Sequence, residues 1–243
     1  MLRFNQVSFS YGTAPFVEGF SFSLRPGELV GLLGANGSGK STLLRLGAGI
    51  LRPRYGTVEL GGRPLGTWRG KERAGMLSYL TQTIDASLPF RVGELVAMGA
   101  AASRAGETSC REALHYVGLN MHRETQVSRL SGGERRRAFL AMVLAQGGSV
   151  LLLDEPLAGL DLRFRYELLD LLVRLQRERS MAILLSLHDL CLARTLDRLL
   201  LIRDGRILAD GPPVSVLEPG LIRRAFDLDP SVNPGCVYPI DRR

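Results

Sequence analysis

A glycine-rich stretch in the N-terminal part of the chain has residues of the type and spacing that bind phosphate groups. It follows the pattern G-x-x-x-x-G-K-S and consists of Gly34, Ala35, Asn36, Gly37, Ser38, Gly39, Lys40 and Ser41, with Thr42 directly after it. Glycines let the backbone wrap closely and point its N–H groups at phosphate oxygens. We expect Lys40 to reach the β- and γ-phosphates, Ser41 to ligate Mg²⁺ and Thr42 to hydrogen-bond phosphate.

Lys40 stands out because the chain uses arginine for nearly every cation. Lys71 is the only other lysine among 31 basic residues. A compact ammonium on a slim stem fits beside phosphates where a planar guanidinium is too wide. A glycine-rich turn without a ligand is the alternative interpretation. The lysine argues against it, and so does the position of the loop between an expected strand and an expected helix.

Two adjacent carboxylates follow a run of four apolar residues, Val150–Leu153. The run predicts a buried strand, and carboxylates at its end are costly unless a cation or hydrogen bonds offset their burial. We therefore expect Asp154 to hold the Mg²⁺ shell and Glu155 to polarise an attacking water as general base. The alternative is a solvated strand end that begins a turn. The carboxylates alone leave the two readings equal, and the phosphate loop upstream favours metal and water chemistry.

A third motif, Leu130-Ser131-Gly132-Gly133-Glu134, precedes three arginines and an apolar stretch. In a purely structural interpretation, Ser131 and Glu134 form a capping box at the start of a helix. In a functional interpretation, two glycines and exposed N–H groups at a helix N-terminus make an anion site. One chain does not need two γ-phosphate sites, so the second one would serve another copy of the chain.

Strand and helix patterns alternate around these motifs. Residues 1–30 show the period-two alternation of short strands, at residues 2–4, 7–9 and 20–24. Further strands are predicted at residues 28–33, 57–60, 75–80, 150–153, 181–187, 199–202 and 206–208. Helices are predicted at residues 40–50, 92–101, 110–117, 134–145 and 163–177. This alternation predicts a mainly parallel sheet with both faces covered.

The composition fits a folded α/β domain and argues against several classes of protein. The chain has 243 residues, of which 45% are hydrophobic, enough for a proper core. Cys110, Cys191 and Cys236 are far apart and odd in number, which argues against a disulfide framework or a zinc site. The sequence shows neither a bilayer-spanning apolar run nor a signal peptide pattern. The net charge of +7 is not concentrated in a tail, which weakens a nucleic-acid role.

The order of the motifs resembles that of the nucleotide-binding subunit of ABC transporters. It runs from the glycine loop through Leu-Ser-Gly-Gly-Glu and Leu-Leu-Leu-Asp-Glu-Pro to a strand-end His188, and the resemblance covers nearly the whole chain. It implies an α/β fold with a P-loop NTPase (RecA-like) core and a mainly parallel sheet, an N-terminal antiparallel β subdomain and a helical ABC-specific subdomain. Residues 1–243 would form a single ABC ATPase domain. Residues 1–84 and 147–243 would make the β subdomain and core, and residues 85–146 the helical signature subdomain.

The resemblance also implies roles for residues outside the motifs. Tyr11 lies where the family has an aromatic that stacks on adenine, with an ordinary strand aromatic as the alternative. Gln82 resembles the glutamine that senses Mg²⁺ and the attacking water. His188 resembles the histidine that contacts the γ-phosphate and positions the water, although a lone histidine after a strand is more often structural. The expected catalytic set is thus Glu155, His188 and Gln82, acting on ATP and Mg²⁺.

The family's head-to-tail dimer implies a second set of nucleotide contacts. ATP would lie between the glycine loop of one copy and Ser131, Gly132 and Gly133 of the other. Asp161 resembles an aspartate that communicates with the opposite active site. The expected partner is therefore a second copy of the chain.

Finer features resemble the ATPases that import metal chelates, namely ferric siderophores, haem or cobalamin. They lie at residues 88–99, 188–193, 204–207 and 225–228. The implied partners are integral membrane permease subunits and, indirectly, a substrate-binding protein, with the chain on the cytoplasmic face of the cell membrane and no nucleic acid bound.

Three alternative functions remain open on the sequence. One is an importer ATPase for another small solute or a metal ion. A second is a soluble ABC ATPase acting on nucleic acid or ribosomes, which only the positive charge supports. A third is a P-loop kinase, in which Leu-Ser-Gly-Gly-Glu has no role.

Overall fold

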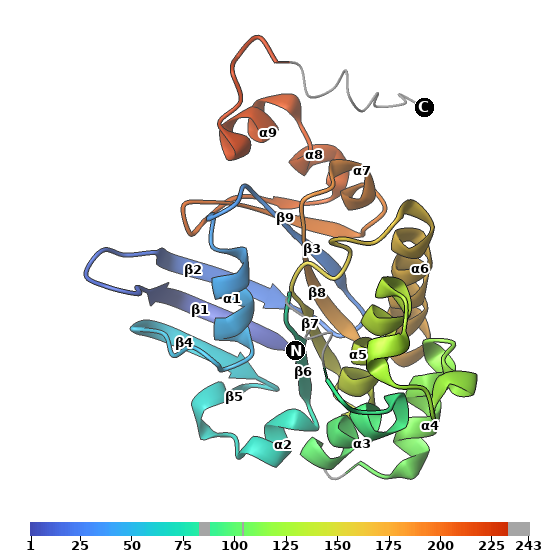
Figure 1. The fold of residues 1–243 in the computed structure, drawn as a ribbon. Helices are drawn as coiled ribbons and strands as arrows, with labels where there is room; N and C mark the ends of the chain where they lie inside the picture. Colours follow the sequence, from blue (N-terminus) through green and yellow to red (C-terminus); the bar gives the residue numbers. More distant parts are fainter. Residues whose placement is uncertain (83–87, 104, 233–243) are drawn as a thin grey trace.

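The computed structural model describes residues 1–82, 88–103 and 105–232, which form two β-sheets and the helices packed around them (Figure 1). The smaller sheet is antiparallel, in the order β2-β1-β4-β5. Its strands are β1 Leu2–Phe9, β2 Val17–Leu24, β4 Tyr55–Leu60 and β5 Arg63–Pro64. Buried and exposed positions alternate along much of β1 and β2, as expected of strands with one face on the core.

The larger sheet has the order β10-β9-β3-β8-β7-β6, and its neighbouring strands are parallel except β9 with β10. Its strands are β3 Leu29–Leu33, β6 Leu77–Leu80, β7 Val150–Leu153, β8 Ala182–Leu187, β9 Arg198–Arg203 and β10 Arg206–Gly211. Every residue of β3, β7 and β8 is buried, because both faces of the sheet are covered. The carboxyl ends of parallel strands share one edge, where such sheets bind ligands.

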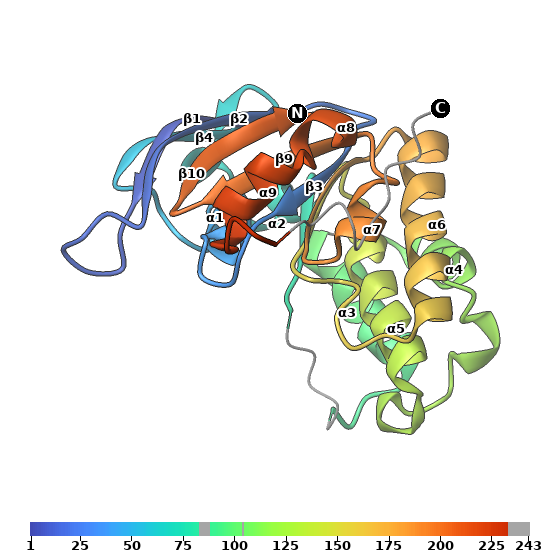
Figure 2. The ribbon, with the colours of Figure 1, turned by 90° about the horizontal axis from the view of Figure 1, so that it is seen from above.

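Helices α3, α4 and α5 pack on one another beside the larger sheet, next to the long helix α6 (Figure 2). These helices are α3 Val92–Ser103, α4 Glu107–Tyr116, α5 Gly132–Ala145 and α6 Leu162–Arg179. The shorter helices are α1 Lys40–Gly47, α2 Gly70–Ala74, α7 Leu190–Ala193, α8 Pro213–Val216 and α9 Pro219–Phe226. Single 3₁₀ turns are η1 Leu65–Thr67, η2 Asn120–His122 and η3 Val127–Arg129. Within the described ranges, no helix combines the length and the apolar character needed to cross a membrane.

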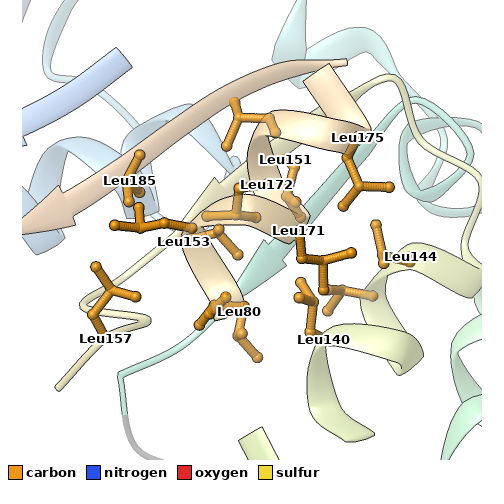
Figure 3. Close-up of a cluster of buried hydrophobic side chains, with 14 of the residues drawn as sticks. Leu80, Leu140, Leu144, Leu151, Leu153, Leu157, Leu171, Leu172, Leu175 and Leu185 are labelled. Atoms are coloured by element: carbon orange, nitrogen blue, oxygen red, sulfur yellow. The ribbon is translucent and has the colours of Figure 1, made fainter. Parts of the chain in front are cut away.

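The larger sheet separates two hydrophobic clusters. Leu151 and Leu153 of β7 belong to the cluster that includes residues of α5 and α6, whereas Val150 and Leu152 belong to the cluster under the antiparallel sheet. Figure 3 shows leucines of α5 and α6 converging on the first pair. Because each side chain of β7 packs against apolar neighbours, the strand is a rigid support for the carboxylates that follow it.

The architecture agrees with the predicted mainly parallel sheet, antiparallel N-terminal sheet and helical group, and differs in detail. The helix after the glycine loop ends at Gly47 rather than residue 50, because Gly49 has a φ of 70° that ends the helix. The strands predicted at residues 2–4 and 7–9 are one strand with a bulge between Phe4 and Val7. The expected subdomain boundary between residues 84 and 85 lies outside the described residues, and so does Cys236.

Candidate active site

The glycine loop connects the buried strand β3 to α1 and needs glycine at two positions for different reasons. A Cβ on Gly34 would lie 2.3 Å from the carbonyl oxygen of Ile202, so the backbone approach leaves no room for a side chain. Gly39, the N-cap of α1, has a φ of 108°, which other residues rarely adopt. The helix that follows directs its positive end at the loop, as in anion-binding sites.

Lys40 is held inside the loop by neutral oxygens. Its Nζ donates to the carbonyl oxygens of Gly34 at 2.7 Å and Ala35 at 3.0 Å, and the residue is only 6% exposed. Desolvation lowers the pKa of Lys40, while the carboxylates of Glu155 and Asp154 act in the opposite direction. Phosphate oxygens are stronger acceptors than carbonyls, so the ammonium is positioned to transfer to them.

Asp154 and Ser41 bring together the oxygen ligands predicted for Mg²⁺. Asp154 follows β7 and is 1% exposed. Its carboxylate accepts hydrogen bonds from Ser41 Oγ at 3.0 Å, Ser186 Oγ at 2.8 Å and Tyr79 OH at 3.3 Å. A hydroxyl and a buried carboxylate in contact are ligands that Mg²⁺ accepts, so these residues fit the ion. Sequence reasoning missed Tyr79 and Ser186, and the one available signal was a serine within the apolar strand β8.

Glu155, Gln82 and His188 meet because they follow three neighbouring parallel strands, β7, β6 and β8. Gln82 Nε2 donates to Glu155 Oε2 at 2.7 Å, and His188 Nε2 lies 2.5 Å from Glu155 Oε1. Glu155 also has a φ of 47°, and its N–H donates to Ser186 Oγ at 2.8 Å. Backbone strain of this kind is concentrated at functional sites. The Glu155 carboxylate is therefore held between an amide and an imidazole.

A cleft of about 640 Å³ joins the glycine loop to these catalytic candidates. Its lining consists of Phe16, Asn36, Gly37, Gly39, Lys40, Ser41, Thr42, Gln82, Glu155 and His188. All of these except Phe16 are residues that the sequence singled out. Phe16 could have been found as an aromatic directly before β2, in a loop that already contains Tyr11.

Tyr11 lies beside the cleft rather than among its lining residues. The residue is 60% exposed, and its hydroxyl shares a hydrogen bond with Thr42 Oγ1 at 3.0 Å. Its ring meets those of Phe9 and Phe16 edge-on, with centroids 4.9 and 5.5 Å away. Adenine stacking by Tyr11 stays a prediction. A phosphate that hydrogen-bonded Thr42 would compete with the Tyr11 hydroxyl for the Thr42 side chain.

Ser131, Gly132 and Gly133 lie at the start of α5 and are not among the described residues that line the cleft. The capping box is present: the N–H of Glu134 donates to Ser131 Oγ at 3.3 Å, and the N–H of Ser131 donates to Glu134 Oε2 at 2.9 Å. The N–H of Ser131 and its hydroxyl both donate to the Glu134 carboxylate, and these two hydrogen bonds lower the pKa of Glu134. Asp161 similarly caps α6, accepting a backbone N–H of that helix at 3.0 Å. Within one chain, both segments therefore have a structural role.

Comparison with known proteins identifies the family of the chain. A family model described as ABC transporter matches residues 17–158, more than half of the chain. The hemin import ATP-binding protein HmuV of Rhodopseudomonas palustris (strain BisB5) is 40% identical over 242 residues, covering 96% of this chain and 92% of that protein. The protein of the same name in Streptomyces coelicolor is 41% identical over 233 residues, covering 92% and 82%.

Solved structures share the fold. The structure of cbiO1 from Clostridium perfringens has a TM-score of 0.81 at 28% identity, with 92% of each chain covered. An inward-facing conformation of an ABC transporter, described as a putative metal-chelate type, has a TM-score of 0.80 at 25% identity, covering 93% of this chain and 89% of that one. The fold and the glycine loop define a nucleotide-binding P-loop ATPase. Within that class, the chain belongs to the ABC transporter family and is its ATP-binding, ATP-hydrolysing domain.

Proposed function

We propose that the chain is the energy-coupling subunit of an importer for a metal chelate, with haem as the cargo. The observation that carries the proposal is an assembled cleft, from the glycine loop to Glu155, in a chain 40% identical over nearly its full length to hemin import proteins. The names of these relatives favour haem over ferric siderophores and cobalamin, the other chelates that the sequence suggested.

ATP binding follows from the loop and the residues beneath it. The phosphates of ATP would lie against the N–H groups of the glycine loop, at the positive end of α1. Lys40 would exchange its carbonyl acceptors for β- and γ-phosphate oxygens. Ser41 and Asp154 would hold Mg²⁺, with Gln82 nearby, and the ion neutralises phosphate charge when it is bound.

Hydrolysis follows from the three residues at the strand ends. Glu155 would accept a proton from the attacking water as the water oxygen bonds to the γ-phosphorus and the bond to the β–γ bridging oxygen breaks. Gln82 and His188 hold the Glu155 carboxylate from two sides in this structure. In the hydrolysing state they would orient the water, and His188 would contact the γ-phosphate.

A second copy of the chain would complete each site. Ser131 and Gly132 are exposed at a helix N-terminus, as required of residues that contact ATP bound to a partner. Gly133 packs against Phe164 of α6, which connects this segment to the helix that Asp161 begins. ATP would close the head-to-tail homodimer and hydrolysis would open it, which changes the relative population of two states.

The dimer would act on permease subunits in the membrane, from the cytoplasmic face, while a substrate-binding protein delivers the cargo on the other side. A growth experiment tests the cargo. The gene is deleted, and cells are grown with haem, a ferric siderophore or inorganic iron as the iron source. We expect growth to fail on haem alone and to be restored by the wild-type gene but not by Glu155→Gln.

Normal growth of the deletion strain on haem would overturn the haem assignment, and failure on the siderophore alone would replace haem with that chelate. Unchanged growth in all media, with tight and salt-sensitive DNA binding by the purified chain, would instead favour the nucleic-acid class.

A further inference from the structure

Arg136 is a buried charge to which the roles above give no task. It lies one turn into α5, and 7% of the residue is exposed. Burial lowers the pKa of Arg136, while the negative charges of Asp154 and Glu155 favour its charged form. A buried guanidinium persists only where hydrogen bonds and opposite charges offset its desolvation, so its partners indicate its purpose.

The guanidinium of Arg136 hydrogen-bonds the backbone just beyond two strands of the larger sheet. Nε donates to the carbonyl oxygen of Pro156 at 3.0 Å and Nη1 to that of Gln82 at 2.9 Å. Nη2 donates to the carbonyl oxygen of Glu155. A planar fork of five N–H donors can bind carbonyls from separate segments at once, which a lysine cannot do with the same geometry. One side chain of α5 therefore ties together the segments that follow β6 and β7.

The two segments that Arg136 ties are those that carry the catalytic side chains. The strained backbone of Glu155 is fixed on both sides, because its N–H donates to Ser186 and its carbonyl accepts from Arg136. The carbonyl of Gln82 is bound by the same guanidinium, and its side chain donates to the Glu155 carboxylate. The position of the Glu155 carboxylate relative to the side-chain amide of Gln82 therefore depends on α5.

We infer that Arg136 is a positioning residue that sets the backbone of Gln82 and Glu155 from α5, so that the helix contacting the partner's nucleotide also controls hydrolysis in its own cleft. The inference rests on the proposed function, which assigns Glu155 as base and Ser131, Gly132 and Gly133 as the partner-facing segment. A shift of α5 moves the guanidinium with it, and the strand ends must then follow or lose their hydrogen bonds. The hydrogen bonds of Arg136 are to residues that follow the strands and not to the glycine loop. We therefore expect one chain to keep its affinity for ATP when Arg136 is replaced.

The test compares Arg136→Gln and Arg136→Lys with a matched control, Arg135→Gln. Arg135 is the neighbouring arginine and also donates to backbone carbonyls, those of Leu130 at 2.9 Å and Val127 at 3.4 Å, but both lie just before its own helix. ATP hydrolysis is measured on the complete transporter assembly, and binding of trinitrophenyl-ATP on the same preparations.

We expect Arg136→Gln to lower kcat by about 10- to 100-fold, the size of effect that a small misplacement of a catalytic group produces. The Kd for trinitrophenyl-ATP should change by less than about twofold, because the lost contact acts on the chemical step. Arg136→Lys keeps the positive charge but lacks the planar guanidinium, so its kcat should lie between those of the wild type and Arg136→Gln. Arg135→Gln should retain the wild-type kcat. Equal loss of binding and kcat, or an unchanged kcat in Arg136→Gln, would overturn the inference.

Amide hydrogen exchange separates positioning from a general loss of stability. Arg136→Gln should speed exchange at Gln82, Glu155 and Ala158 while β3 and α6 keep wild-type rates. Faster exchange throughout the chain, with kcat per folded molecule unchanged, would show that Arg136 only stabilises the fold. Full hydrolysis by Glu155→Gln would refute the proposed base, and the exchange pattern would still decide whether Arg136 holds the two backbone segments.

Discussion

Two adjacent carboxylates, those of Asp154 and Glu155, have different partners, which supports the different roles proposed for them. Asp154 is buried and bound by hydroxyl groups of Ser41, Ser186 and Tyr79. Glu155 instead faces the cleft between an amide and an imidazole. Hydroxyl groups leave the first carboxylate available to a cation, whereas the second faces the space where a water would attack. Although Asp154 and Glu155 are neighbours in the sequence, the strand directs one carboxylate to hydroxyl groups and the other to Gln82 and His188.

Replacing Glu155, the proposed base, tests whether the two carboxylates differ in role. Glu155→Gln keeps the size of the side chain but removes the proton acceptor, so hydrolysis should fall by about 10²- to 10⁴-fold, the usual contribution of a general base. The Kd for ATP should stay near the wild-type value, because the glycine loop and Lys40 are unchanged. Phosphate release and binding of a fluorescent ATP analogue measure the two quantities.

The control is Glu112→Gln, which removes an exposed carboxylate paired with Arg179 at 2.7 Å. A surface ion pair of this kind contributes little, so hydrolysis should be unchanged. Rapid hydrolysis by Glu155→Gln would show that another group accepts the proton.

Most of the site could be predicted because its motifs are contiguous in the sequence. The glycine loop and the pair Asp154 and Glu155 each carry their chemistry within a few residues. Ser186 could not be assigned, because its contact with Asp154 depends on the pairing of Leu153 with Leu185 in neighbouring strands. No local pattern specifies that register, since both strands are uniformly apolar apart from the serine.

At the scale of elements, helix packing depends on close approach at a single glycine. Gly99 of α3 faces α5, and a Cβ there would lie 1.9 Å from the carbonyl oxygen of Met142. That oxygen belongs to the backbone of a helix and cannot move independently. The contact joins α3 to α5, the helix that carries Arg136 and begins after Ser131. The distance between α3 and α5 therefore affects the positions of Arg136 and Ser131.

Gly99→Ala should therefore destabilise the protein although alanine favours helices. Overpacking typically costs about 1–3 kcal/mol, and a Cβ only 1.9 Å from a backbone oxygen favours the upper end of that range. That cost exceeds the gain of about 1 kcal/mol in helix propensity. Thermal unfolding measures the change, and the expected fall in Tm is about 2–4 °C for each kcal/mol lost. The matched control is Gly70→Ala in α2, where a Cβ meets nothing within 4 Å. Equal or higher Tm for Gly99→Ala would show that α3 and α5 can separate at little cost.

The elements that sequence reasoning missed are short and depend on their surroundings. Helix α7 has four residues, and Asp189 caps it by accepting the N–H groups of Cys191 and Leu192. A helix of this length has no periodic pattern and is unstable on its own, so packing and capping decide whether it forms. The long helices α5 and α6 were predicted because several turns of good helix formers follow one another in each of them.

At the scale of the whole molecule, the proposed composite site needs two segments of the chain that do not line the same cleft. The cleft contains the glycine loop, and the N-terminus of α5 with Ser131 is not among the described residues that line it. In a two-fold symmetric pair each copy presents both surfaces, so two equivalent composite sites form when the loop of one copy meets α5 of the other. Such an arrangement makes each site depend on two chains.

Mixing two inactive variants tests whether sites are shared between copies. Lys40→Ala disables the loop and Ser131→Arg blocks the start of α5, so each homodimer has two defective sites. In a mixed dimer, one site receives both defects and the other pairs an intact loop with an intact α5. We therefore expect hydrolysis to return when the two purified variants are combined, with binding of the nucleotide only by the copy that retains Lys40. If each chain held a complete site, both copies in the mixture would remain defective and no activity would return. Mixing each variant with more of itself is the control, because it changes concentration without creating an intact pair.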